Sequence, residues 1–153
     1  MLSYLSDLAS VVLKLPKKSS KVTTLPGQPK NMNALCYLLQ MGCDIEVFDV
    51  LLAKSNTEHI NEVVHILTND TLLGSVRGTA LHLACHLGMD AHVNSLIKNK
   101  VANLDIKANN GYTALHFAAC AKSPIICKLL LESGIDGNIQ DIEGNTALMY
   151  SFA

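Results

Sequence analysis

The amino-acid sequence predicts an all-α fold built from a short series of repeated helical units. The main observation is a segment that recurs three times with nearly the same spelling, beginning at Thr79, Thr113 and Thr146. These spacings of 34 and 33 residues are typical of repeat proteins. Aromatic residues make up only 5 % of the 153 residues and Trp is absent, so the core must consist mainly of aliphatic side chains. Such a core favours packed helices over a β-sandwich.

At the N-terminus, residues 1–15 are expected to form an amphipathic helix that ends at Pro16. The polar residues of this segment recur at helical spacing, and apolar residues fill the opposite face. The polar positions are Ser3, Asp7, Ser10 and Lys14, and the apolar ones are Leu5, Leu8, Ala9 and Val12. We expect this helix to dock on the rest of the chain as a cap. Contact with a membrane surface or a partner is the alternative.

The charge of the chain is divided unevenly between its two parts. The formal net charge is −1, but residues 1–30 carry +4 and residues 31–153 carry −5. Residues 16–30 contain three of the four prolines and no acid, which indicates an exposed basic linker. A chain this close to neutrality is not expected to bind nucleic acid. Membrane contact is expected only through residues 1–21, whose PKKSSK stretch also resembles a weak nuclear-import signal.

The five cysteines are scattered and include no CxxC pair. The first residues lack the cationic start of a signal peptide, and no apolar run is long enough to span a bilayer. These features predict free thiols in a reducing compartment, so a cytoplasmic location is expected, with the nucleus or delivery into a host cell as alternatives.

The three copies resemble the ankyrin repeat. The second copy is the best match, with NGYTALHFAA over residues 110–119 followed by ICKLLLESGID over residues 126–136. These stretches are similar to the family's G-x-T-P-L-H-x-A-A start and I-V-x-L-L-L-x-x-G-A-D finish, with Ala in place of Pro. The resemblance implies an ankyrin-repeat α-solenoid, in which each unit is a helix, a turn, a second helix and a short β-hairpin.

The remaining chain is divided by aligning it with these copies. Residues 74–107 and 108–140 are predicted to form full repeats. Residues 45–73 form a degenerate repeat whose first helix covers residues 46–53 and whose second helix is capped by Ser55 and Glu58. Residues 31–44 are expected to supply an extra helix or partial unit, so that the whole array covers residues 31–153.

The last copy, residues 141–153, is truncated within its first helix. Either the array ends on half a unit or the chain was cut from a longer protein, and we favour the second interpretation. An unpaired last helix would leave Leu148 and Phe152 poorly covered, whereas terminal repeats normally carry a polar outer face.

Several residues match the structural part of the family's motif. In the family, the Thr and His of TxLH hydrogen-bond to neighbouring backbone at a buried corner, and glycines occupy turns with positive φ. The matching positions are Thr79, His82, Gly88, Gly111, Thr113, His116, Gly134, Gly144 and Thr146.

The resemblance further implies a non-catalytic module that binds another protein through its concave face and hairpin tips. Carried over position by position, the tip residues are Arg77, Asn109, Asn110, Tyr112, Ile142, Glu143 and Asn145. Those on the concave helix face are Lys54, His86, Leu87, Cys120 and Ala121. Tyr112 is singled out because an exposed Tyr at a fingertip is a typical hot spot. Arg77 departs from the pattern, because Gly78 stands where the next unit has Tyr112.

Two other function classes are weighed against this one. The first is a peripheral membrane adaptor that uses the basic, amphipathic N-terminus. The second is an enzyme with a reactive thiol, for which His86 and Cys120 are a conceivable pair. His82, Cys85 and His86 have helical spacing for a metal, but a structural corner and a packed thiol account for them better. The sequence contains no known catalytic or nucleotide-binding motif. We therefore expect no enzyme activity, no cofactor, no metal and a monomer, standing alone or within a larger scaffold or host-directed effector.

Overall fold

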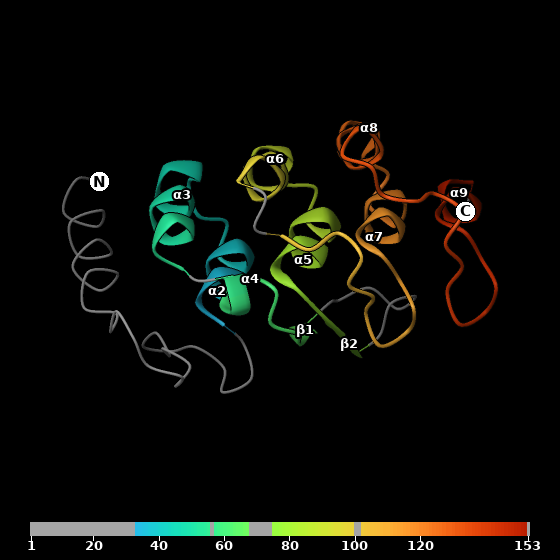
Figure 1. Ribbon diagram of the computed structural model, residues 1–153, viewed down its shortest axis with the longest axis horizontal. Coiled ribbons are helices and arrows are strands. Elements are labelled where there is room, and N and C mark those ends of the chain that lie inside the picture. Colours follow the sequence, from blue (N-terminus) through green and yellow to red (C-terminus); the bar gives the residue numbers. More distant parts are fainter. Residues whose placement is uncertain (1–32, 56, 68–74, 100–101, 153) are drawn as a thin grey trace.

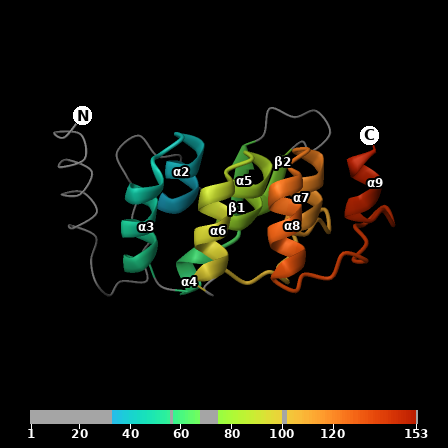
Figure 2. The same ribbon diagram turned by 90° about the horizontal axis from the view of Figure 1, so that it is seen from above.

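The structure is a computed structural model that describes residues 33–55, 57–67, 75–99 and 102–152. Its helices lie in two layers (Figures 1 and 2). The inner layer contains α2 (Ala34–Gln40), α5 (Ala80–His86), α7 (Ala114–Cys120) and α9 (Ala147–Ser151). The outer layer contains α3 (Ile45–Lys54), α6 (Asp90–Lys98) and α8 (Pro124–Glu132). The predicted helical solenoid with short hairpins is confirmed.

The connections between units project from the inner layer (Figure 1). After α3, the chain forms the short helix α4 (Thr57–Ile60) and then the antiparallel strands β1 (Val64–Leu67) and β2 (Ser75–Gly78). The register pairs Val64 with Gly78. The two later connections close tight turns, in which the N–H groups of Ala108 and Asp141 donate to the carbonyls of Tyr112 and Asn145. Each unit therefore presents one finger on the same side of the stack.

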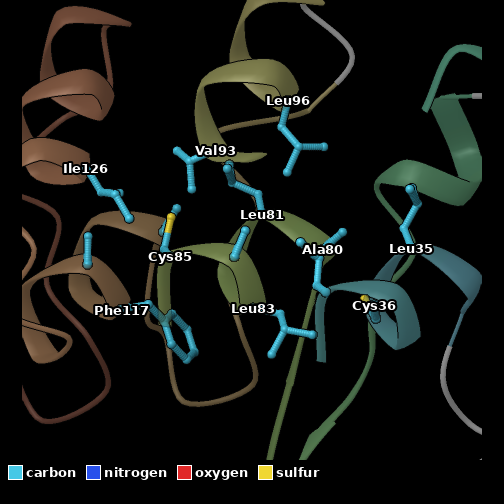
Figure 3. Close-up of a cluster of buried hydrophobic side chains, with 14 of the residues drawn as sticks. Leu35, Cys36, Ala80, Leu81, Leu83, Cys85, Val93, Leu96, Phe117 and Ile126 are labelled. Atoms are coloured by element: carbon cyan, nitrogen blue, oxygen red, sulfur yellow. The ribbon is translucent and has the colours of Figure 1, made fainter. Parts of the chain in front are cut away.

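Aliphatic side chains from both layers form the core between the helices. Figure 3 shows Cys85 of α5 pointing toward Val93 of α6, with Ile126 of α8 beside them. All three side chains are fully buried. The alanines at positions 84 and 118 are also fully buried, and their small size lets neighbouring inner helices approach closely.

The first unit differs from the expected one. We expected α3 to be the first helix of a degenerate repeat, followed by a second helix after Ser55. Instead, α2 packs on α5 and α3 packs on α6, so α2 and α3 are the inner and outer helices of one unit. Over the described residues 57–67, the chain forms the short helix α4 and then β1. For the described part of the first unit, residues 33–55 and 57–67, the expected helix arrangement is therefore wrong.

The turn at Gly42 explains why α2 and α3 form one unit. Its φ of +69° matches the +68° of Gly88, and both glycines lie between the two helices of a unit. Asn33-Ala34-Leu35-Cys36 stands where α5 has TALH, with the same spacing to the glycine. The Asn33 side chain caps α2 by accepting a hydrogen bond from the Cys36 N–H at 2.9 Å. Residues 33–36 are a degenerate copy of the TALH corner. They were the signal in the sequence that the first unit is complete.

Three further expectations concern the two ends of the chain. Leu148 and Phe152 are strongly exposed, as predicted for an uncovered last helix. The expected helix over residues 1–15 and linker over residues 16–30 lie outside the described residues, and so does the membrane contact through residues 1–21. None of the described helices combines the length and the apolar composition that a membrane span requires.

Candidate interaction surface

The buried corner of the TALH motif fixes the start of each complete inner helix. The N–H of Thr79 donates to Nδ1 of His82 at 3.0 Å, and the Thr79 hydroxyl oxygen lies 2.9 Å from the same nitrogen. The Thr79 side chain also accepts from the backbone N–H of His82, which completes a reciprocal cap. Burial lowers the pKa of His82 to about 4, and the nearby backbone of Ile106 and Tyr112, which acts in the opposite direction, does not offset this effect. His82 is therefore neutral and structural.

His116 repeats this corner in the next unit. Its Nδ1 accepts from the N–H of Thr113 at 3.2 Å, so the proton lies on Nε2, which donates to the carbonyl of Asn145 at 3.2 Å. Burial lowers its pKa as well. At the third corner, Met149 replaces the histidine, and the side chain of Thr146 makes no capping bond. Thr79, His82, Thr113 and His116 thus take the structural positions that the motif implied.

The inner helices end in a row of accessible side chains. Leu87 is exposed and His86 is half-buried at the end of α5, and Cys120 and Ala121 are half-buried at the end of α7. The equivalent positions at the end of α2 are Gln40 and Met41, both exposed, which we did not predict because the first unit was misaligned. We refer to these six residues as the inner ridge.

Lys54 does not belong to this ridge. It is the last residue of α3, which lies in the outer layer (Figure 1). Its assignment to the concave helix face is wrong, because that assignment assumed that α3 was an inner helix.

The hairpin tips form a second set of exposed residues. Asn109 and Glu143 are exposed, and Ile142 is exposed to 75 %. Arg77 is also exposed, but it lies within β2 opposite His65 and not at a tip, because this finger is longer than the other two.

Backbone hydrogen bonds join successive fingers. The N–H of Arg77 donates to Oδ1 of Asn109 at 2.8 Å, and the N–H of Asn109 donates back to the carbonyl of Arg77 at 3.2 Å. The N–H of Ile142 donates to the carbonyl of Asn110 at 3.3 Å. Gly111 permits this approach, since a Cβ there would lie 2.9 Å from the Ile142 nitrogen. The fingers are therefore held as one continuous edge.

Tyr112 is buried, which corrects the prediction of an exposed fingertip. Only 8 % of it is exposed. Its ring stacks on His116 with centroids 5.3 Å apart and meets Phe117 and Tyr150 with centroids 5.7 and 5.2 Å away. Burial, followed by interactions with Tyr150, raises its pKa. The residue before the TALH corner packs beneath the finger because the chain turns inward there to begin α7.

Asp141 and Tyr150 organise the last finger and were not predicted. The Tyr150 hydroxyl donates to Oδ2 of Asp141 at 2.6 Å, and Oδ1 accepts from the N–H groups of Glu143 and Asn145 at 2.8 and 2.9 Å. Burial tends to raise the pKa of Asp141, but these hydrogen bonds lower it below the ordinary value. An Asp that opens a Gly-containing turn is a recognisable signal for such a loop. Nothing in the sequence marks Tyr150 as its partner.

Four of the five thiols that the structure describes, those of Cys36, Cys43, Cys85 and Cys127, are poorly suited to nucleophilic chemistry. Burial raises the pKa of Cys36 to about 12 and that of Cys43 to about 11, and it also raises the pKa of Cys85 and Cys127. A protonated thiol is a weak nucleophile. Among the described residues, no group of three His, Cys, Asp or Glu side chains is arranged to hold a metal ion.

Several known proteins are similar in sequence to this chain. The sequence model described as "Ankyrin repeats (3 copies)" matches residues 50–141 and 102–153. The chain is 33 % identical over 87 residues to BTB/POZ domain and ankyrin repeat-containing protein NPR2 of Oryza sativa subsp. japonica, which covers 57 % of this chain and 14 % of that protein. It is 40 % identical over 73 residues to SH3 and multiple ankyrin repeat domains protein 2 of Homo sapiens, covering 48 % of this chain and 4 % of that protein. A viral relative, putative ankyrin repeat protein L371 of Acanthamoeba polyphaga mimivirus, is 39 % identical over 64 residues, or 42 % of this chain and 8 % of that protein. The chain spans only a small part of the length of these relatives.

Proposed function

The chain belongs to the ankyrin repeat family, and we propose that it is a non-catalytic module that binds a partner protein through the inner ridge and the hairpin tips. The observation that carries this proposal is the repeated placement of accessible side chains at the ends of the inner helices α2, α5 and α7. Ankyrin repeats are generally protein–protein interaction modules, so the fold and this surface point to the same class of function.

The composition of the inner ridge suits a protein interface. Met41, Leu87 and Ala121 occupy the same position in successive units and form an apolar row. Gln40 and His86 lie beside this row. An apolar centre with a polar rim is the usual anatomy of a protein-binding patch.

The hairpin tips add a preorganised edge next to the ridge. The hydrogen bonds between fingers hold Asn109 and Ile142 in place before any partner arrives. Ordering these loops in advance reduces the conformational entropy that binding would otherwise cost. Of the predicted tip residues, Ile142 and Glu143 are the best candidates for contact because both are strongly exposed. Asn145 has mainly a structural role in the turn. Its backbone N–H donates to Oδ1 of Asp141, and its carbonyl accepts from Nε2 of His116.

A catalytic role has less support. The raised pKa values of four thiols favour packing over reactivity. We propose that the chain is a monomer in the cytoplasm. It acts either alone or as part of a larger scaffold or effector.

The proposal is tested by affinity capture with matched surface variants. Leu87→Arg and Ala121→Arg place a charge on the ridge, whereas Ile125→Arg places the same charge on the exposed side of α8. We expect a partner that is captured by the wild type and by Ile125→Arg, and that is lost with both ridge variants. Equal capture by all four proteins would refute the ridge as the binding site.

A further inference from the structure

The first unit has one side that faces away from the rest of the described stack. Helix α2 packs on α5 and α3 packs on α6, and both of these contacts lie on the same side of the unit (Figures 1 and 2). The later units show which side chains of α2 and α3 lie on the opposite side, because every later unit has a preceding unit packed against it.

On α2, the side chain in question is that of Tyr37. It holds the position of Leu83 in α5 and of Phe117 in α7, each four residues after the capping residue of its helix. The Phe117 ring meets His82 and His86 of the preceding inner helix, with centroids 5.3 and 6.2 Å apart. Leu83 points from α5 toward α2 (Figure 3). Phe117 is fully buried and Leu83 is exposed to only 1 %, whereas Tyr37 is half-buried.

Helix α6 shows which positions of an outer helix face the preceding unit. Its third and sixth residues are His92 and Ser95. Nε2 of His92 lies 3.0 Å from the carbonyl oxygen of Cys43, in the turn before α3. The Ser95 hydroxyl donates to the carboxylate of Asp49 in α3. The third and sixth positions of α6 are therefore directed at the preceding unit.

The third and sixth residues of α3 are Val47 and Val50. Val47 is half-buried and Val50 is exposed to 48 %. Together with Tyr37 they give the first unit an apolar surface that spans both of its helices, and we refer to these three residues as the N-terminal face. The equivalent positions in the second unit are in contact with α2 and α3, so this face is suited to packing against a further helix.

The chain itself contains a segment with the matching pattern. Leu5, Leu8, Ala9 and Val12 recur at positions i, i+3, i+4 and i+7, which is the spacing of an apolar stripe along one side of a helix. The connecting residues 16–30 contain three of the four prolines and are unsuited to a continuous helix.

The dimensions allow this segment to reach the N-terminal face. A helix over residues 1–15 is about 22 Å long, which is enough to cover α3, whose length is about 15 Å. The connection over residues 16–32 extends to about 55 Å when fully stretched. It therefore permits the helix to lie on the first unit in either direction.

Charge favours one of these two directions. Lys17 and Lys18 follow directly after the predicted helix. Glu46 lies in the first turn of α3 and Lys54 in its last turn, and both side chains are exposed. Glu46 forms no ion pair with another described residue. A helix antiparallel to α3 brings the two lysines to Glu46, whereas a parallel helix brings them to Lys54, where like charges repel.

We propose that residues 1–15 form a helix that docks on the N-terminal face of the same chain, antiparallel to α3. Its apolar stripe takes the place that the preceding unit takes against each later unit. This contact is separate from partner binding at the inner ridge. It also buries the apolar stripe, which is then withheld from a membrane surface.

Hydrogen exchange of the full chain, followed by mass spectrometry, tests the docking. An isolated helix of this length is marginal in water, so protection of the amides in residues 5–12 requires a contact. We expect this protection in the wild type, and at least tenfold faster exchange in Val50→Asp. Ile125→Asp is the matched control, since Ile125 is exposed to 57 % but lies on α8, and it should leave this exchange unchanged. Exchange of residues 93–96 in α6, measured in the same samples, verifies that the stack remains folded.

Variants of the segment and of its charges test the details of the contact. Leu8→Asp should speed exchange of residues 5–12 as much as Val50→Asp does, whereas Ser10→Asp, on the polar side, should have little effect. Glu46→Lys should speed this exchange several-fold. Adding Lys17→Glu and Lys18→Glu to that variant should restore the protection if the helix is antiparallel to α3.

Vesicles that contain phosphatidylserine distinguish docking from membrane contact. Release of the helix in Val50→Asp should increase vesicle binding several-fold over the wild type. The proposal is overturned if the vesicles bind both proteins with the same affinity, or if residues 5–12 of the wild type exchange as fast as an unfolded peptide. It is also overturned if Ile125→Asp speeds their exchange as much as Val50→Asp, or if a photoreactive group at Leu8 crosslinks two chains instead of reaching α2 or α3 of its own chain.

Discussion

His116 donates a hydrogen bond through Nε2 to the backbone carbonyl of Asn145, 3.2 Å away and 29 residues later in the chain. The other ring nitrogen, Nδ1, accepts from the N–H of Thr113. One neutral imidazole therefore caps its own helix and fixes the finger of the next unit. The next unit has Met149 at this position and lacks both interactions.

Replacing the histidine should destabilise the stack measurably. His116→Leu leaves the Asn145 carbonyl and the Thr113 N–H without their partner, which should lower the free energy of unfolding by about 1–3 kcal/mol. The reverse change, Met149→His, should restore the cap with Thr146 and add roughly 0.5–1 kcal/mol. Urea unfolding measures both, with Met149→Leu as a control that should stay close to the wild type. A neutral effect of His116→Leu would contradict this role.

Acid should destabilise the protein below pH 6.5. The pKa of His82 is about 4 in the folded protein and 6.5 in its unperturbed state, so the unfolded chain binds a proton that the folded chain excludes. The stabilising contribution is complete above pH 6.5 and is lost as the pH falls toward 4, by an amount on the order of 3 kcal/mol. The lowered pKa of His116 acts in the same direction.

Two measurements test whether acid lowers the stability of the protein. Urea unfolding at pH 7.5 and pH 5.0 should show the lower stability at pH 5.0. NMR titration of the His82 ring should give a pKa well below that of an exposed histidine. Stability that is constant or higher at pH 5.0 would show that the ring is not buried in its neutral form.

Two hairpin glycines make a matched pair. Gly111 and Gly144 have φ values of +79° and +82°, so an alanine at either position carries the same backbone strain of roughly 1 kcal/mol. Only at Gly111 would the new Cβ meet backbone, 2.9 Å from the nitrogen of Ile142, whereas nothing lies within 4 Å at Gly144. Thermal unfolding should therefore show that Gly111→Ala costs about 1–3 kcal/mol more than Gly144→Ala. Equal costs would indicate that the two fingers are not in contact.

Tyr112 should matter for folding and not for contact with a partner. Tyr112→Ala removes a buried ring from the cluster with His116 and Tyr150, which should cost about 3 kcal/mol or more. Tyr112→Phe keeps the ring and should cost roughly 1 kcal/mol, with partner capture unchanged. If Tyr112→Phe remained fully folded but lost the partner, the hydroxyl would be a contact group after all.

The sequence predicted the helical solenoid correctly because the signals for its later helices are local. Each TALH corner specifies a helix start through contacts only three residues apart, and the turn residues Gly88 and Gly111 take the positive φ expected of them. The first unit was misaligned for a physical reason. Asn33 and Cys36 cap α2 without Thr or His, and the longer finger of β1 and β2 interrupts the period before α5.

The exposure of individual side chains was harder to predict. Tyr112 follows the turn residue Gly111 directly, yet its ring lies beneath the finger because His116 and Tyr150 provide a pocket for it. Tyr150 comes from the next unit, so this contact depends on how two units stack. Local patterns do not carry that information, whereas the helix positions within a unit depend only on local periodicity.

Site-specific photo-crosslinking tests the central claim, that the inner ridge binds the partner, most directly. A photoreactive phenylalanine analogue is placed at Leu87 or Ala121 on the ridge, and at Ala53 or Ile125, which are exposed in the outer layer. Crosslinked proteins are identified by mass spectrometry. The ridge positions should yield one common partner that the outer positions do not yield. A partner crosslinked equally from all four positions, or only from Ala53 and Ile125, would contradict binding at the inner ridge.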